Sequence, residues 1–158
     1  MKALSLHHVG IVIPDEHTAE LFARLFGLVE DYRGYVPEYE ALCIFMKGND
    51  MSPIEFVVPD GGNLMAFNKG KGGIHHLAFE VADIRAAREE MTKEGIQFLE
   101  EIPIKGAGDF IVNFIRPSSA YRILVEFVEK RNDACSDVLC LINSIASEKP
   151  LPPASDEF

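Results

Sequence analysis

An internal repeat constrains this chain more than any other feature, because residues 7–27 have a similar counterpart 68 positions later. The matching residues are His7-His8 with His75-His76, Asp15 with Asp83, and Gly27 with Gly95. Two copies of one small unit can build a site that neither copy could build alone. A chain of 158 residues, 47% of them hydrophobic, has the length of one compact domain or two small modules sharing a core.

Each copy predicts the same order of elements, β-α-β-β-β. Both open with a run rich in Val, Ile, Leu and Phe, residues 4–13 and 73–81, which is typical of a strand. An aspartate at the N-cap position then begins each helix and a glycine ends it, Asp15 with Gly27 and Asp83 with Gly95. Three short apolar strands follow in each copy, predicted at 28–32, 41–46 and 54–58, and at 96–99, 110–115 and 121–128.

We therefore expect a single domain over residues 1–130, built from modules 4–60 and 73–129. After it, apolar residues at helical spacing predict an amphipathic C-terminal helix over 131–148. Residues 149–158 include three prolines and no core-forming pattern, so we expect a disordered tail.

Charge and composition exclude several classes of function. Fifteen Lys and Arg against 25 Asp and Glu give a net charge of −10, which repels nucleic acid. No apolar run approaches the roughly 20 residues of a membrane span, and no secretion signal is seen, so we expect a cytoplasmic protein with no membrane partner. Three cysteines without a CxxC pair indicate reduced, buried thiols rather than a disulfide scaffold or thiolate zinc site.

The strands of the repeat carry four polar residues at equivalent places. His8 and Glu55 lie on the first and last predicted strands of the first module, and His76 and Glu126 hold the same places in the second. Each glutamate lies within an apolar strand, where an uncompensated charge costs several kcal/mol. If the modules pack about a pseudo-twofold axis, two imidazoles and two carboxylates converge, which predicts a metal site.

A simpler interpretation exists for each residue alone. A single strand histidine is more often hydrogen-bonded than ligating, and a single strand glutamate more often faces solvent; the pairwise equivalence favours the metal site. Gly10 and Ala78 share a strand face with the two histidines and leave room for a cavity. By the same alternation, His7 and His75 should point to the opposite face, with a packing role or a role behind the ligands.

These motifs resemble the vicinal oxygen chelate superfamily, which includes glyoxalases, methylmalonyl-CoA epimerases, extradiol dioxygenases and fosfomycin or bleomycin resistance proteins. The resemblance covers roughly residues 4–129, is most specific over Gly73–Ile84, and is closest to the epimerase branch. It implies an α+β fold in which two tandem βαβββ modules form an open, cupped mixed sheet. It also implies a homodimer and a divalent metal on the floor of the cup.

The resemblance places His8, Glu55, His76 and Glu126 on the four metal-ligand positions of the superfamily. Two imidazoles and two carboxylates suit a non-redox cobalt, nickel, manganese or zinc ion acting as a Lewis acid. This set implies α-proton transfer in an acyl-CoA thioester or a thiol adduct, with methylmalonyl-CoA epimerisation as the first candidate. Glu126 is the expected base and Glu55 its partner on the other face.

Some epimerases carry a separate carboxylate on the third strand, where this chain has Cys43 and where Glu40 is the nearest acid. The loop at 116–122 also departs from the family pattern. Four cations could meet coenzyme A phosphates or be solvated: Lys69, Lys71, Lys105 and Arg116.

Three alternatives to the epimerase stay open. A glutathione-dependent glyoxalase (lactoylglutathione lyase) is the closest variant. An iron-dependent extradiol dioxygenase would need only His8, His76 and Glu126, so Glu55 argues against it. A non-catalytic protein that binds a small ligand is disfavoured by the complete set of four ligands.

Overall fold

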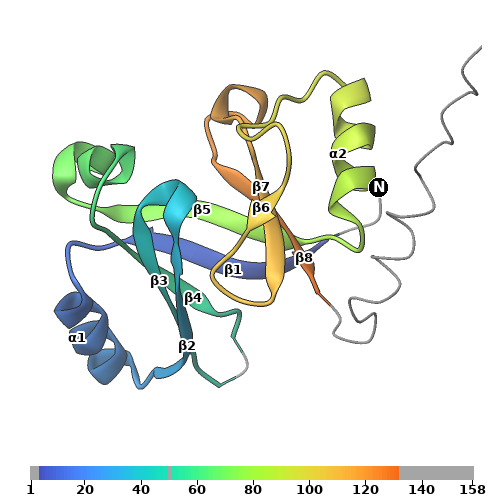
Figure 1. Cartoon of the computed structure of the whole chain (residues 1–158). Helices are drawn as coiled ribbons and strands as arrows, with labels where there is room; N and C mark the ends of the chain where they lie inside the picture. The colour runs from blue at the N-terminus through green and yellow to red at the C-terminus, as the bar shows by residue number, and fades with distance from the viewer. Residues whose placement is uncertain (1–3, 50, 132–158) are drawn as a thin grey trace, which may run out of the picture.

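The computed structural model describes residues 4–49 and 51–131, which form one curled mixed sheet with two α-helices (Figure 1). The eight strands lie in the order β2-β3-β4-β1-β5-β8-β7-β6. Their bounds are β1 Ser5–Val12, β2 Val29–Val36, β3 Ala41–Lys47, β4 Ile54–Pro59, β5 Gly73–Glu80, β6 Ile104–Lys105, β7 Phe110–Ile115 and β8 Val125–Lys130. Three 3-10 segments connect them: η1 Pro37–Tyr39, η2 Asn63–Gly70 and η3 Pro117–Ser119.

The two modules meet along the antiparallel pair β1–β5, and their register is reciprocal. His8 pairs with Ala78, while Gly10 pairs with His76. Within each module the first strand runs parallel to the last, β1 beside β4 and β5 beside β8. Because equivalent residues exchange partners across the seam, the halves are related by a pseudo-twofold axis. The predicted α+β fold of two cupped βαβββ modules is thus confirmed.

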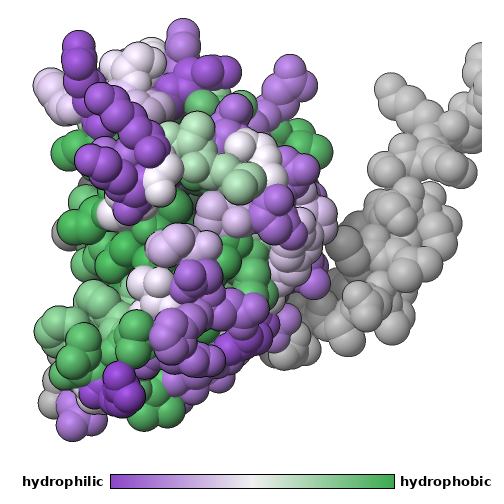
Figure 2. Space-filling view, turned by 90° about the vertical axis from the view of Figure 1, so that its left-hand side faces the viewer, coloured by the Kyte–Doolittle hydropathy of each residue, from purple (hydrophilic) through white to green (hydrophobic). Residues whose placement is uncertain are grey.

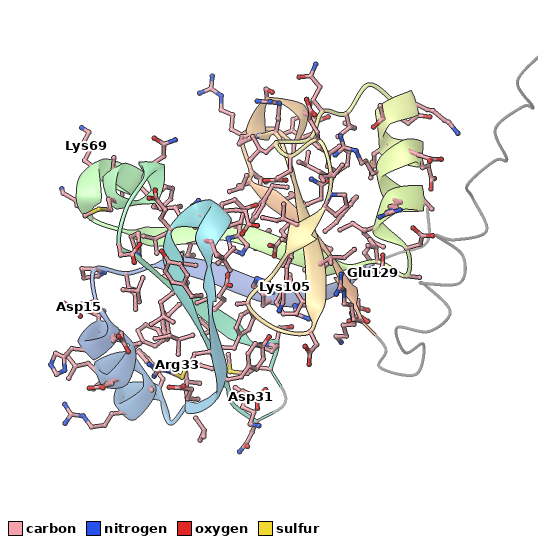
Figure 3. The ribbon with its side chains drawn as sticks, in the orientation of Figure 1. Asp15, Asp31, Arg33, Lys69, Lys105 and Glu129 are labelled. Atoms are coloured by element: carbon pink, nitrogen blue, oxygen red, sulfur yellow. The ribbon has the colours of Figure 1, made fainter. Side chains whose placement is uncertain are left out.

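The helices α1 (Glu16–Phe26) and α2 (Ile84–Lys93) lie at opposite ends of the molecule, outside the sheet (Figure 1). Asp15 caps α1 by accepting hydrogen bonds from Thr18, and Asp83 caps α2 by accepting one from the Ala86 amide. Glu129 on β8 lies beside the start of α2 and accepts a hydrogen bond from the Ile84 amide (Figure 3). Both helices therefore begin where the aspartates predict.

Apolar packing divides into three clusters. One lies under each helix, around Phe56 for α1 and around Phe127 for α2. The third lies on the concave side and includes Phe45 and Phe110. Apolar residues also gather over a broad part of the face that the first module presents in Figure 2. Within the described residues, neither α-helix is long and apolar enough to cross a bilayer.

The second module departs from the sequence prediction. The strand predicted at 96–99 is wrong: only Phe98 makes an isolated bridge, to Ile115, and the edge strand is β6, further along the chain. The last strand begins at Val125 rather than at residue 121, because the turn that follows η3 extends to residue 122 and residues 123–124 form no regular element. Cys43 is free and buried, as expected. The predicted helix 131–148 falls outside the described residues apart from position 131, and the tail 149–158 falls wholly outside them.

Candidate metal centre

Four buried side chains converge at the seam between the modules. The Nε2 atoms of His8 and His76 are 3.0 Å apart. Glu55 Oε2 lies 3.3 Å from Nε2 of His8 and 3.1 Å from that of His76. Glu126 Oε2 lies 3.2 and 3.7 Å from the same two nitrogens. All four side chains come from the strands predicted to supply them, β1, β4, β5 and β8.

The sheet register explains this convergence. Gly10 pairs with Glu55 on one side and His76 on the other, and Ala78 is flanked in the same way by Glu126 and His8. A Cβ atom at Gly10 would lie only 2.0 Å from the His76 ring, so glycine is required for the imidazole to enter the site.

Two carboxylates concentrate negative charge in this buried place. His8 is 1% exposed, and Glu55 and Glu126 are 6% and 5% exposed. Burial alone would lower the pKa of His8, but the two glutamate carboxylates beside its ring raise it to about 10. Burial would likewise raise the pKa of Glu55, but hydrogen bonds with His76 and His8 lower it. The site therefore favours bound positive charge.

One carboxylate oxygen of Glu126 indicates that the positive charge in this site is a bound cation. Glu126 Oε2 is fully buried and has no hydrogen-bond partner among the described residues, although it lies 3.2 Å from Nε2 of His8. An unpartnered buried carboxylate oxygen is costly and calls for a partner. The ligand atoms of His8, His76 and Glu126 all lie within 4.8 Å of one another, which suits ligands of one ion bound at about 2.0–2.2 Å. Glu55 approaches both imidazoles but is not part of this group of three. The residues present thus fit a divalent cation; their role as ligands stays a prediction.

The prediction that His7 and His75 face away from the site is wrong. Each occupies a β-bulge, because the β1–β5 register skips His7 between Leu6 and His8 and skips His75 at the equivalent place. A bulge turns two consecutive side chains toward one side of a sheet. His7 Nδ1 lies 2.7 Å from His8 Nδ1, and His75 Nδ1 lies 2.9 Å from His76 Nδ1. The predicted role behind the ligands agrees with these contacts.

The concave side above the four residues holds an apolar cavity of about 260 Å³, which we call the chamber. Cys43 lines it, and burial, followed by the charge of Glu55, raises the pKa of its thiol. Glu40 does not reach the chamber, since its carboxylate lies against Gly61 and Gly62. Among the described lining residues, Glu55 and Glu126 are therefore the only carboxylates.

None of the four predicted phosphate-binding cations lines the chamber. Lys105 lies on the β6–β7 hairpin, and Lys69 lies at the outer end of η2 (Figure 3). The hairpin crosses over β2, where the Ala107 carbonyl oxygen comes so close to Gly34 that a Cβ atom there would be 2.1 Å away. Lys105 lines a second, more open hollow on the other side of the hairpin, beside His7.

The sequence analysis did not predict the buried hydrogen-bond network that lies beside the chamber. The Asn113 amide donates to the Glu100 carboxylate at 2.7 Å, and Arg88 donates to the Asn113 carbonyl oxygen at 2.6 Å. Tyr39, from the first module, donates its hydroxyl to the same carboxylate at 2.7 Å. These residues lie outside the repeat register, and the only available signal was a lone asparagine within an apolar strand.

Comparison with known proteins agrees with the fold. Residues 7–114 match the family model described as Glyoxalase/Bleomycin resistance protein/Dioxygenase superfamily. The chain belongs to this superfamily.

Its relatives include named enzymes. It is 30% identical over 131 residues to a mitochondrial methylmalonyl-CoA epimerase of Dictyostelium discoideum, covering 79% of this chain and 78% of the relative. It is 32% identical over 127 residues to an ethylmalonyl-CoA/methylmalonyl-CoA epimerase of Cereibacter sphaeroides, covering 77% and 94%. A crystal structure of methylmalonyl-CoA epimerase from Mycobacterium tuberculosis superimposes with a TM-score of 0.77 at 25% identity, covering 84% and 95%.

Proposed function

We propose that this chain is a divalent-metal-dependent epimerase that transfers the α-proton of an acyl-CoA thioester, with methylmalonyl-CoA as the first substrate to test. The convergence of two imidazoles and two carboxylates in a buried site carries the proposal. The epimerase relatives support the reaction type and the acyl-CoA substrate.

His8, His76, Glu55 and Glu126 would hold the cation. Bound there, it would supply Lewis-acid polarisation of the thioester carbonyl, which makes the α-hydrogen more acidic. This help is necessary because an ordinary glutamate pKa of about 4.3 is far too low for unaided removal of such a proton.

The protein's own groups then move the proton. Glu126 would take the α-proton on one face, because its side chain lines the chamber in which the substrate would sit. Glu55 would return a proton to the opposite face, since it approaches the same two imidazoles from β4, on the other side of the seam. The apolar walls of the chamber would exclude water, so the proton is not lost to solvent.

A glutathione-dependent glyoxalase is the second candidate, and Cys43 favours it. The position where some epimerases carry a separate carboxylate here holds a buried thiol, so the two predicted ligands Glu55 and Glu126 are the only carboxylates among the described lining residues of the chamber. A glyoxalase needs no third carboxylate, and its hemithioacetal substrate has the same exchangeable α-hydrogen.

Proton–deuterium exchange distinguishes these functions. Metal-loaded protein is incubated with methylmalonyl-CoA in heavy water, and in parallel with the hemithioacetal of methylglyoxal and glutathione. We expect the α-hydrogen NMR signal of methylmalonyl-CoA to disappear with the wild type and to persist with Glu126→Gln. Glu20→Gln, a change on the exposed surface of α1, is the matched control and should exchange normally.

Retention of the α-hydrogen of methylmalonyl-CoA by the wild type would rule out the proposed epimerase. Isomerisation of the hemithioacetal alone would assign the glyoxalase. Metal analysis of protein purified under reducing conditions tests the dioxygenase, because that enzyme would hold iron.

The specific ion, a homodimer and a cytoplasmic location stay predictions. Leu25 and Phe26 at the end of α1 and Val29 at the start of β2 are exposed, and they support a contact with a second chain, since apolar surface often marks an interface.

A further inference from the structure

The chamber above the candidate metal centre is lined from both modules by hydrocarbon side chains. They include Val36, Val57, Leu64, Leu99, Phe114 and Leu124. Its volume of about 260 Å³ is below the roughly 300 to 1,000 Å³ of sites that enclose a drug-sized ligand. The chamber therefore suits part of a substrate, such as an acyl group, rather than a whole coenzyme A.

No positive charge is available on this wall. Among its described lining residues there is no lysine or arginine. The Nδ1 atom of His75 already contacts Nδ1 of His76, 2.9 Å away. The Tyr39 hydroxyl already donates to Glu100. An anion entering the chamber would meet no cationic side chain among the described lining residues, only neutral polar groups such as the Asn63 amide, and would pay for desolvation.

The charge at the chamber floor leads to the same conclusion. Glu55 and Glu126 together balance one divalent cation, so no net positive charge remains to attract a further anion away from the metal. A substrate carrying only a methyl group at its α-carbon would leave much of the chamber to water. A longer hydrocarbon group would displace that water from an apolar wall, which is favourable.

Resting on the proposed function, we infer that the preferred substrates of this chain are acyl-CoA thioesters with an uncharged alkyl substituent of several carbons at the α-carbon, seated in the chamber. Leu64 from η2 and Leu124 before β8 would limit the length of that substituent, because both line the chamber and are only half-buried.

A substrate series tests this inference. Rates of α-hydrogen exchange are measured in heavy water for methyl-, ethyl-, propyl- and butylmalonyl-CoA with metal-loaded protein. We expect kcat/KM to rise about fourfold per added methylene, or roughly 60-fold from methyl to butyl. Exchange with methylmalonyl-CoA that does not increase along the series would overturn the inference but leave the epimerase function intact. No exchange with any member would remove the proposed function, and the inference with it.

Two variants locate the effect. Leu124→Phe and Leu64→Phe each add volume to the chamber, so each should lower the ratio of kcat/KM for butyl- over methylmalonyl-CoA by at least tenfold. Leu21→Phe on α1, outside the chamber, is the matched control and should keep the wild-type ratio. Because the measurement is a ratio within one protein sample, partial misfolding of a variant does not imitate the result. An unchanged ratio in both chamber variants would contradict the inference.

Discussion

At the scale of single residues, the two bulges decide how the histidines are used. Strict alternation along β1 and β5 would send His7 and His75 to the far side of the sheet. Each bulge instead places a second imidazole behind the candidate ligand, with its Nδ1 atom near the Nδ1 of that ligand. A group that fixes the outer nitrogen of a ligating histidine sets its tautomer and orientation, leaving Nε2 for the ion.

This contact predicts an effect of His75 on metal affinity. His75→Phe should weaken binding of a divalent ion 10–100-fold, because His76 loses the partner of its Nδ1 atom, whereas His75→Asn should recover part of the loss. Isothermal titration with Zn²⁺ measures the affinity, and ¹⁵N NMR of the imidazoles reports the tautomer of His76. His17→Asn, on the exposed surface of α1, serves as the control. Equal affinity in wild type and His75→Phe would reject this role.

A substitution of Gly10 gives a second prediction about metal binding. Gly10→Ala should abolish metal binding while the protein still folds, because the added Cβ atom overlaps the position of the His76 ring. Overpacking of this kind costs about 1–3 kcal/mol of unfolding free energy. Zn²⁺ titration and urea denaturation give the two quantities separately. Retained tight binding would show that His76 is not held where the structure places it.

At the scale of elements, the sequence predicts most of the first module and less of the second. The helix boundaries follow from capping aspartates and from Gly27 and Gly95, which both adopt the positive φ expected of them. The strand predicted at 96–99 fails because its apolar residues instead pack under α2 and line the chamber. Local hydrophobicity cannot distinguish those uses, since the difference depends on contacts far along the chain.

The buried network of Asn113 belongs to this scale, since it joins β7 to α2 and to the segment before β6. Asn113→Ala should lower the unfolding free energy by about 1–3 kcal/mol, because Arg88 and Glu100 each lose a buried partner. Urea denaturation followed by circular dichroism measures the loss. Asn49→Ala, an exposed change in the turn after β3, should fall within about 0.5 kcal/mol of the wild type. Similar stabilities for both variants would contradict the prediction.

At the scale of the whole molecule, the repeat was sufficient to predict the architecture, and pairwise equivalence was sufficient to single out His8, Glu55, His76 and Glu126. The structure brings these four side chains together; their ligand roles await metal-binding measurements. The lining of the chamber was not predictable, because residues of η1, η2 and the β6–β7 hairpin reach it only after the sheet has curled.

Protons and metal should compete for the assembled site. In the metal-free protein, the raised pKa of His8 means that its charge interaction stabilises the fold fully below about pH 6.5 and is lost as the pH rises through about 10. A metal ligand must be unprotonated, so binding near pH 8 should release about one proton per ion. Calorimetric titration in two buffers of different ionisation enthalpy counts that proton. A heat of binding that is the same in both buffers would mean that His8 is already neutral.

The reciprocal register along β1–β5 gives each half of the molecule one imidazole and one carboxylate. Neither half could therefore hold the predicted cation alone, and a bound cation would link the two halves. Chelation should consequently loosen the seam first, so amide hydrogens of β1 and β5 should exchange sooner than those beneath the two helices.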